Sequence, residues 1–288
     1  MKSRILPTLV LALAGAVAVG AAEPLQLPLR SRAKDNGQVR EEMKRWDPAK
    51  TALVICDMWD THTCPASAAR VDELAPRVND VAQALRARGA LIIHCPSGTM
   101  QFYADTPQRR LAQAAPVVQP KVPLLRTCPL DLTREALLPI DDSEPCDGPR
   151  TWKKGDPMPW TRQNSAIAVV EGDAITDSLE AFYLIRQRGI EHVLICGVHL
   201  NMCVLHRPFA IRQFVIQGIE MVLMRDLTDT MYNPAQRPHV AHFEGTRLMV
   251  AHVERYWCPS TTSAAILGGQ PFRFKGDPAP TAVAGEED

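Results

Sequence analysis

The sequence predicts a single α/β domain with a three-layer α/β/α (Rossmann-like) fold and a mainly parallel central sheet. Short apolar runs, each of a length typical of a buried strand, recur along the chain. Segments with apolar residues every three or four positions separate them, and glycines follow several of these segments, as they do at helix ends. Strands and helices that alternate in this way are joined by right-handed crossovers, so the strands lie parallel and helices cover both faces.

The strands are expected at residues 51–56, 90–94, 167–170, 192–196 and 220–224. Each is an apolar run too short to be a typical helix. The helices are expected at residues 74–88, 177–188, 204–217 and 245–256. Their apolar residues repeat with the helical period, as Leu74, Val78 and Leu85 do, which gives each helix one face for packing on the sheet.

The first residues have the layout of a signal peptide. Lys2 and Arg4 precede an apolar run over residues 5–19, and small residues follow up to Ala22. A membrane anchor is the alternative, but about 15 apolar residues are fewer than the roughly 20 that a membrane span needs. We therefore expect residues 1–22 to be a signal peptide and the chain to be exported, to the periplasm or the exterior.

The rest of the chain divides by composition. Residues 23–48 are polar without a clear period and are expected to form an N-terminal arm, and residues 49–262 the folded domain. Within that domain, residues 116–159 are rich in proline and charge, which predicts a long ordered insertion or lid. Residues 263–288, rich in glycine, proline and alanine, are expected to be a flexible tail.

The charge balance limits the class of partner. The chain has 288 residues, with 32 basic and 32 acidic side chains and a formal net charge of +0. A balanced chain gives no electrostatic reason to bind nucleic acid or, after signal cleavage, an anionic membrane surface. A small-molecule substrate is the expected partner, and the sequence leaves a homo-oligomer open.

Export makes disulfides feasible among the eight cysteines. Cys128 and Cys146 flank a proline-rich, acidic loop and are the expected pair, and Cys64 and Cys258 are further candidates for bridging. Cysteines 56 and 196 lie inside apolar runs, where a thiol is typically a buried apolar group.

Ligands of parallel sheets bind beyond the carboxyl ends of the strands, which here are residues 57–64, 94–98, 197–203 and 225–230. Cys203 begins a helix directly after such a strand end. The positive end of the helix dipole favours a thiolate there, and the backbone N–H groups can hold the oxyanion that forms when a thiolate attacks a carbonyl. Cys203 is therefore the candidate nucleophile.

The segment Gly197-Val-His-Leu-Asn-Met-Cys-Val204 resembles the nucleophile signature G-V-x-T-N-x-C-V of the isochorismatase-like cysteine hydrolases, a family that includes nicotinamidases. Leu200 departs from it, since threonine is usual there. The first strand and Asp57 are similar to the family's strand ending in a catalytic aspartate, and the strand ending at Asp226 matches a later one. The resemblance runs from about residue 52 to about residue 256, and the insertion is its weakest part.

The resemblance implies roles for these residues. Cys203 attacks an amide-type carbonyl, and Asp57 takes the thiol proton and delivers it to the leaving group. The backbone N–H groups of Cys203 and of the preceding turn form the oxyanion hole. A cis peptide bond not involving proline is implied in that turn, between Val198 and His199.

The third family residue is a lysine, which this sequence does not place cleanly. Arg162, near a Ser-Ala pair that resembles the family's Ser-Ala-Phe, is the expected substitute, although it stands one position off the usual spacing. A different alignment leaves no basic residue there. With a pKa above about 12, an arginine stabilises a thiolate but exchanges no proton as a lysine can.

Other polar residues at the strand ends are expected to line the substrate pocket, namely Trp59, His62, His94 and Asn201. No cofactor is expected to be required. A zinc site made by Asp60, His62 and His94 is the alternative, since some nicotinamidase-type relatives hold a metal with an Asp-x-His pair. The basic segment 207–212 is expected to be a solvated helix face.

The sequence thus predicts an exported cysteine-dependent hydrolase that cleaves a small-molecule amide or related C–N bond through a thioester-type intermediate on Cys203. The alternative is a catalytically weak or inactive binding module of the same fold that has lost the lysine.

Overall fold

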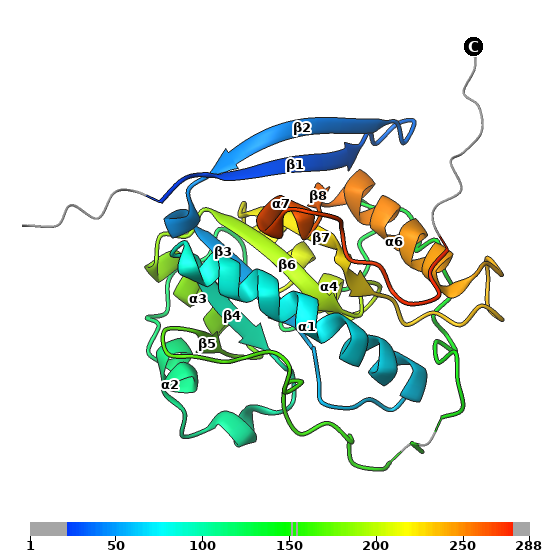
Figure 1. Cartoon of the computed structure of the whole chain (residues 1–288), viewed down its shortest axis with the longest axis horizontal. Helices are drawn as coiled ribbons and strands as arrows, with labels where there is room; N and C mark the ends of the chain where they lie inside the picture. The colour runs from blue at the N-terminus through cyan, green and yellow to red at the C-terminus, as the bar shows by residue number, and fades with distance from the viewer. Residues whose placement is uncertain (1–21, 151, 154, 279–288) are drawn as a thin grey trace, which may run out of the picture.

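A computed structural model of the chain describes residues 22–150, 152–153 and 155–278, so the expected signal peptide lies almost entirely outside the described residues. Its centre is an eight-stranded sheet in the order β2-β1-β8-β7-β6-β3-β4-β5 (Figure 1). The strands are β1 (Leu25–Arg32), β2 (Val39–Trp46), β3 (Thr51–Cys56), β4 (Leu91–Cys95), β5 (Ala174–Ile175), β6 (His192–Val198), β7 (Glu220–Asp229) and β8 (Ser260–Thr261).

Strands β3 to β8 pair in parallel, and only β1 and β2 at one edge introduce antiparallel pairs. The connecting helices are α1 (Pro65–Ala87), α2 (Pro107–Gln113), α3 (Glu180–Gln187), α4 (Cys203–His206), α5 (Ile211–Ile216), α6 (His242–Tyr256) and α7 (Ala264–Leu267), with short 3-10 turns η1 (Pro48–Lys50) and η2 (Met100–Tyr103). None of the helices in the described part of the chain is long and apolar enough to cross a membrane.

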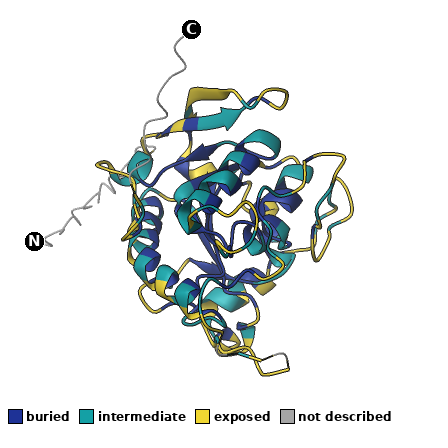
Figure 2. Ribbon diagram, turned by 90° about the vertical axis from the view of Figure 1, so that its right-hand side faces the viewer, coloured by how far each residue is buried: buried dark blue, intermediate teal, exposed yellow. Residues whose placement is uncertain are grey.

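Successive side chains of the central strands point alternately into two separate cores. Leu53 and Ile55 point to the core covered by α1 and α7, whereas Val54 points to the core covered by α2, α3, α5 and α6. Both cores are buried between the sheet and its helices (Figure 2). The predicted three-layer fold with a mainly parallel sheet is therefore confirmed.

The segment 23–48, expected to be an arm, instead forms the β1–β2 hairpin. Leu25, Leu27 and Leu29 alternate with exposed or proline positions, and all three are buried on one face. This period-2 pattern is typical of a half-buried strand, and Pro28 within it obscures the signal. The hairpin extends the sheet beyond β8 through a short antiparallel contact.

Three other expectations need correction. Residues 167–170 form no strand, and the two-residue strand β5 pairs with β4 instead. The expected helix at 204–217 is divided into α4 and α5, because Pro208 holds Arg207 in an extended conformation. The expected flexible tail is anchored as far as it is described: Phe274 is buried against the α1 core, and Asp226 accepts hydrogen bonds from the backbone of Ser263 and Phe272.

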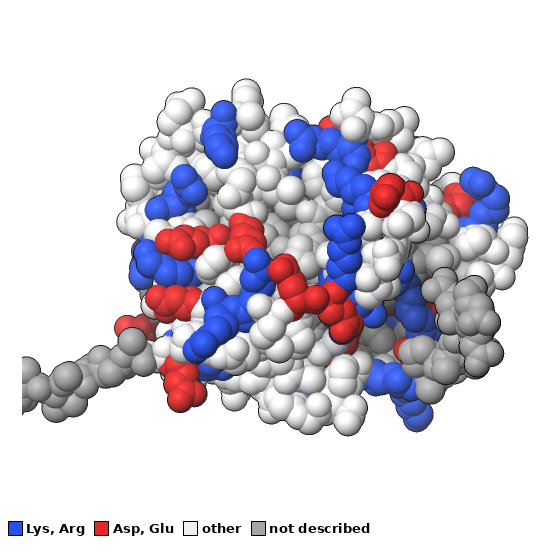
Figure 3. All heavy atoms as spheres, turned by 90° about the horizontal axis from the view of Figure 1, so that it is seen from above, with Lys and Arg blue, Asp and Glu red and all other residues white. Residues whose placement is uncertain are grey.

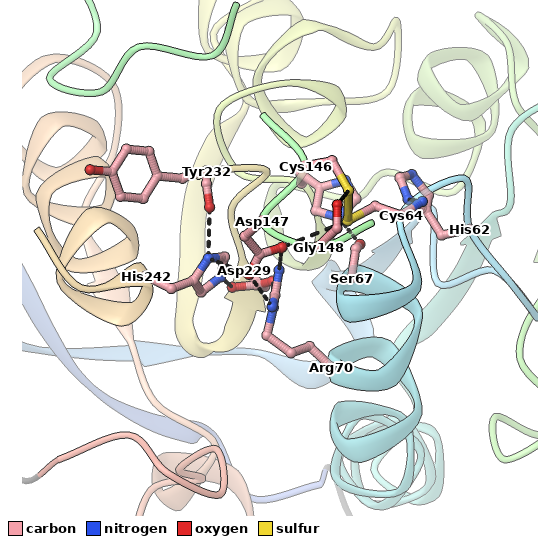
Figure 4. Close-up of a disulfide and its surroundings, with 11 residues drawn as sticks. His62, Cys64, Ser67, Arg70, Cys146, Asp147, Gly148, Asp229, Tyr232 and His242 are labelled. Carbon is pink, nitrogen blue, oxygen red and sulfur yellow. Dashed lines mark hydrogen bonds and ion pairs between the residues drawn. A yellow bond between two sulfur atoms is a disulfide. The ribbon is translucent and has the colours of Figure 1, made fainter. Parts of the chain in front are cut away.

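The disulfide joins Cys64 to Cys146, so the expected pairing of Cys128 with Cys146 is wrong (Figure 4). Cys128 is a buried free thiol that donates to the side chain of Gln213, and Cys258 is also free and buried. No local pattern indicates this pairing, because the two cysteines are 82 residues apart in the sequence. The bond fastens the insertion to the start of α1.

Next to the disulfide, an ion-pair network makes the same connection. The Arg70 guanidinium on α1 donates to Asp147 in the insertion (2.7 Å) and to Asp229 at the end of β7 (2.6 Å). His242 at the start of α6 lies 2.8 Å from the other oxygen of Asp229. Figure 4 shows these side chains gathered beside the bridge. The insertion is thus held to the sheet covalently and electrostatically.

We expect replacement of both bridging cysteines by serine to lower the free energy of unfolding by about 2–4 kcal/mol, because the bridge closes a long loop and limits the unfolded chain. Urea denaturation of the variant and of the oxidised parent measures this difference. The parent assayed under reducing conditions is the matched control and should show the same loss. Equal stability of all three samples would contradict the expected role of the bridge.

Candidate active site

Asp57 lies directly after β3 and is fully buried. Its backbone has a φ of 48°, a left-handed conformation that non-glycine residues seldom adopt and that often marks functional sites. The N–H of Asp57 donates to the carbonyl of Cys95 (3.0 Å), and one carboxylate oxygen accepts from the N–H of Ser97 (2.7 Å). These bonds hold Asp57, at the end of β3, against the end of the neighbouring strand β4.

Gly197 allows the end of β6 to approach the backbone of Cys56 at the end of β3. A Cβ atom at position 197 would lie 2.0 Å from the carbonyl oxygen of Cys56, and the φ of Gly197 is 104°. No other residue fits this contact without displacing the β3 backbone. The close approach brings the turn after β6, and Cys203 with it, next to Asp57.

Cys203 begins α4, and the peptide bond between Val198 and His199 in the preceding turn is cis, at the position that the resemblance implies. The turn is closed by bonds from the N–H groups of Met202 (2.9 Å) and Val204 (3.2 Å) to the carbonyl of His199. The first N–H groups of a helix lack partners within the helix, so that of Cys203 is free for a substrate oxygen. Leu200, which departs from the family signature, is a core residue.

The cation beside these two residues is Arg207. Its Nε lies 3.5 Å from the Oδ2 atom of Asp57, and the charges of both Asp57 and Arg207 act on the pKa of the Cys203 thiol. Arg207 directly follows α4 and stands four residues after Cys203, so the two side chains share one side of the turn. The described structure therefore gathers an acid, a thiol and a cation at one strand edge.

Arg162, the expected cation, lies elsewhere. Its side chain is half exposed, with its Nε 3.9 Å from Asp60 and its guanidinium over the ring of Phe102. The backbone explains this position, because the N–H of Asp60 donates to the carbonyl of Arg162 and so holds that arginine beside Asp60.

The expectation of a solvated face at 207–212 is also corrected. Arg207 faces Asp57, and Arg212 is buried in an ion pair with Glu135 (2.7 Å). The break at Pro208 is the physical reason, because the segment is not one continuous helix with a single outer face.

Burial dominates the electrostatics of the cluster. It raises the pKa of the Cys203 thiol, and the nearby Asp57 carboxylate raises it further, whereas the Arg207 cation lowers it. Burial likewise raises the pKa of Asp57, and Arg207 lowers it. Arg207 thus opposes the effect of burial on both the thiol and the carboxyl group. Transfer of the proton from the thiol to Asp57 leaves the net charge beside Arg207 unchanged.

Cys203 is the one partly exposed free cysteine among the described residues. Its neighbours Cys56 and Cys95 are fully buried, and burial followed by the Asp57 charge raises the pKa of both thiols. Of these three cysteines, Cys203 is therefore the candidate nucleophile, and the raised pKa values keep the other two thiols protonated.

An aromatic wall of Trp59, Trp160 and His62 lies beside the turn. The Trp59 indole donates to the carbonyl of Ser97 (3.0 Å) and stacks on Trp160 at 4.4 Å between ring centroids. His62 stacks on Trp160 at 5.5 Å and meets His199 edge-on at 5.0 Å. Trp59 and His62 were expected at the site, and Trp160, which directly follows the insertion at residues 116–159, stacks on both of them.

His62 in this wall and the adjacent His199 are both neutral near pH 7. Burial lowers the pKa of His62 to about 4 and lowers that of His199 well below its usual value. His199 Nε2 lies 2.6 Å from the hydroxyl of Ser67 on α1, which fixes the ring orientation.

His94 and Asn201, expected in the pocket, are bonded within the fold. His94 is fully buried between Gln163 (3.1 Å) and Asp173 (3.0 Å). Asn201 donates to the carbonyl of Met231 (3.1 Å) and accepts from its N–H (2.9 Å). Their polar atoms are thus occupied by partners within the protein.

The metal alternative is not supported by the geometry. The Asp60 carboxylate is bonded to Thr161, and His94 is held by Asp173, so neither turns toward His62. Among the described residues no three histidine, cysteine, aspartate or glutamate side chains are placed to hold a metal ion.

Comparison with known proteins finds solved structures at low sequence identity. A cysteine hydrolase from Pseudomonas syringae pv. phaseolicola 1448A is 16% identical with a TM-score of 0.47, and the match covers 76% of this chain and 92% of that one. An isochorismatase family protein from Burkholderia thailandensis is 14% identical with a TM-score of 0.43, covering 76% and 94%. The structures matched include isochorismatase-family proteins and cysteine hydrolases.

An N-carbamoylsarcosine amidase from Thermoplasma acidophilum is 14% identical with a TM-score of 0.35, and the match covers 62% of this chain and 83% of that one. No protein-family model and no curated protein matches the chain.

Proposed function

We propose that the chain is an exported cysteine-dependent hydrolase that cleaves a small-molecule amide or related C–N bond through a thioester on Cys203. The observation that carries the proposal is the placement of Asp57, Arg207 and Cys203 at the carboxyl edge of the sheet, with Arg207 Nε 3.5 Å from Asp57 and Cys203 opening α4 directly after the turn that follows β6. An acid–base group, a nucleophile and a charge-stabilising group are the elements that acyl transfer requires.

In the first half-reaction the thiol proton passes to Asp57 while the sulfur attacks the carbonyl carbon. The carbonyl oxygen becomes an oxyanion, for which the N–H groups of Cys203 and the preceding turn are the candidate donors. The C–N bond then breaks as Asp57 gives the proton to the departing nitrogen, which leaves as an amine or ammonia. Cys203 is left as a thioester.

In the second half-reaction Asp57 takes a proton from water, whose oxygen attacks the thioester carbon. The C–S bond breaks, the carboxylic acid leaves, and the proton returns to the sulfur. Arg207 remains protonated throughout and stabilises negative charge as it moves between the carboxylate and the sulfur. Arg207 thus takes a charge role that the resemblance assigns to a lysine.

Export is part of the proposal, and the Cys64–Cys146 bridge supports it because disulfides persist in oxidising compartments. The signal-peptide layout of the first residues is the independent sequence argument. Detection of the mature chain in a cell-free or periplasmic fraction would test this part.

The test of activity is turnover of a panel of small amides and ureides by the parent and by Cys203→Ala. The parent is expected to hydrolyse at least one member, and the variant none. Turnover that survives in Cys203→Ala would exclude the thioester route. No turnover by the parent, together with slow alkylation of Cys203 by iodoacetamide, would favour the binding-module alternative.

A further inference from the structure

Strand β2 forms one edge of the sheet, and in the described structure it pairs only with β1. Its sequence is Val39-Arg-Glu-Glu-Met-Lys-Arg-Trp46, and Val39 and Met43 are exposed apolar residues. Figure 3 looks onto the side of the molecule that carries the hairpin, where basic and acidic side chains are interspersed. We infer that β2 pairs antiparallel with β2 of a second copy of this chain, centred on Met43.

The geometry of antiparallel pairing restricts how the strand can meet its own copy. Backbone N–H and C=O groups of successive residues point alternately to the two sides of a strand, and opposed residues must both point toward each other or both point away. In two identical strands, opposed positions must therefore both be odd-numbered or both be even-numbered. A symmetric pair is then centred on a residue and never between two residues.

The order of charges selects Met43 as that centre. Met43 then meets Met43 of the second copy, Glu42 meets Lys44, and Glu41 meets Arg45. By symmetry each unlike-charge pair occurs on both sides of the centre. Glu42 and Lys44 of one chain already lie on the same face, 3.6 Å apart, so pairing brings two such ion pairs together.

The neighbouring registers bring like charges together, which is unfavourable for directly opposed residues. Centring on Glu42 places Glu42 against itself and Arg40 against Lys44. Centring on Lys44 places Lys44 against itself and Glu41 against Asp47. The strand thus has one register in which all charged neighbours are complementary.

Charged edge strands usually protect a protein from pairing with arbitrary strands. This protection fails only for a partner with the reverse order of charges, and β2 is its own such partner. The contact involves one strand edge per chain, so the dimer is expected to be weak and reversible, as small interfaces are. Salt is expected to weaken it, because the ion pairs are exposed.

The test is sedimentation equilibrium of the purified chain over a wide range of concentrations. The parent is expected to form a reversible dimer, and Glu42→Lys to weaken it at least about tenfold, since the introduced lysine would face Lys44 of the second copy. The swap Glu42→Lys with Lys44→Glu restores complementary charges and should restore the dimer. Glu171→Lys, an exposed charge reversal near the opposite edge of the sheet, is the matched control and should leave the dimer unchanged.

Mixing provides a second readout that does not depend on the stability of one variant. Glu42→Lys and Lys44→Glu, each weakened alone, should form a mixed dimer with each other, because both opposed pairs between positions 42 and 44 are then of unlike charge. A monomeric parent at all concentrations, a dimer insensitive to Glu42→Lys, or no mixed dimer would overturn the inference.

Discussion

Replacement of Asp57 by asparagine is expected to lower kcat/KM by about 10²–10⁴-fold at neutral pH. Asparagine nearly matches the volume of aspartate but cannot take the Cys203 proton. The loss should appear in steady-state kinetics on any amide that the parent hydrolyses. Asp60→Asn is the matched control, because that carboxylate bonds Thr161 and not the thiol, and it should retain most of the rate. Similar losses in both variants would contradict the assignment.

The pH profile gives a further check on Asp57. Burial raises the pKa of this carboxyl above the usual value of an aspartate, and catalysis requires its ionised form. Activity is therefore expected to be present above that raised pKa and to fall as the pH drops through it. A profile of kcat/KM that stays flat down to the ordinary pKa of aspartate would speak against Asp57 as the base.

The second large effect is expected from Arg207→Gln, which should lower kcat/KM by about 10–100-fold, because a hydrogen bond to a charged group contributes about 1.5–3 kcal/mol. The side chain is 39% exposed, so water screens the interaction and the smaller factor is expected. Arg207→Lys keeps the charge and should retain more of the rate. Arg162→Gln is the control and should leave the rate unchanged.

Arg207 also influences the acid limb of the pH profile, that is, the pH range in which activity falls as Asp57 becomes protonated. Its cation lowers the pKa of Asp57, so its removal should shift the acid limb toward higher pH, whereas Arg207→Lys should leave it nearly in place. A structural role alone would lower the rate without this shift. An unchanged limb in Arg207→Gln, or a larger rate loss in Arg162→Gln, would overturn the assignment.

The parts of the fold that could be predicted depend on short-range patterns. The apolar run before Asp57 and the strand–turn–helix around Cys203 are local, and both form as expected. The edge hairpin was missed although Leu25, Leu27 and Leu29 alternate, since Pro28 argues against a central strand while an edge hairpin tolerates it.

The missed parts of the site depend on long-range contacts or on an overlooked spacing. The Cys64–Cys146 bridge joins segments far apart in sequence, which no local pattern reveals. Arg207 is different, because it stands four residues after Cys203, and residues four apart lie on the same side of a helical turn. That spacing would have identified it without a structure.

The central claim is that Cys203 carries the acyl group, and mass spectrometry of acid-quenched enzyme during turnover tests it most directly. We expect a mass increase equal to the acyl part of the substrate, located on the peptide that contains Cys203 and absent from Cys203→Ala. An adduct on another residue, or full turnover by Cys203→Ala, would contradict it.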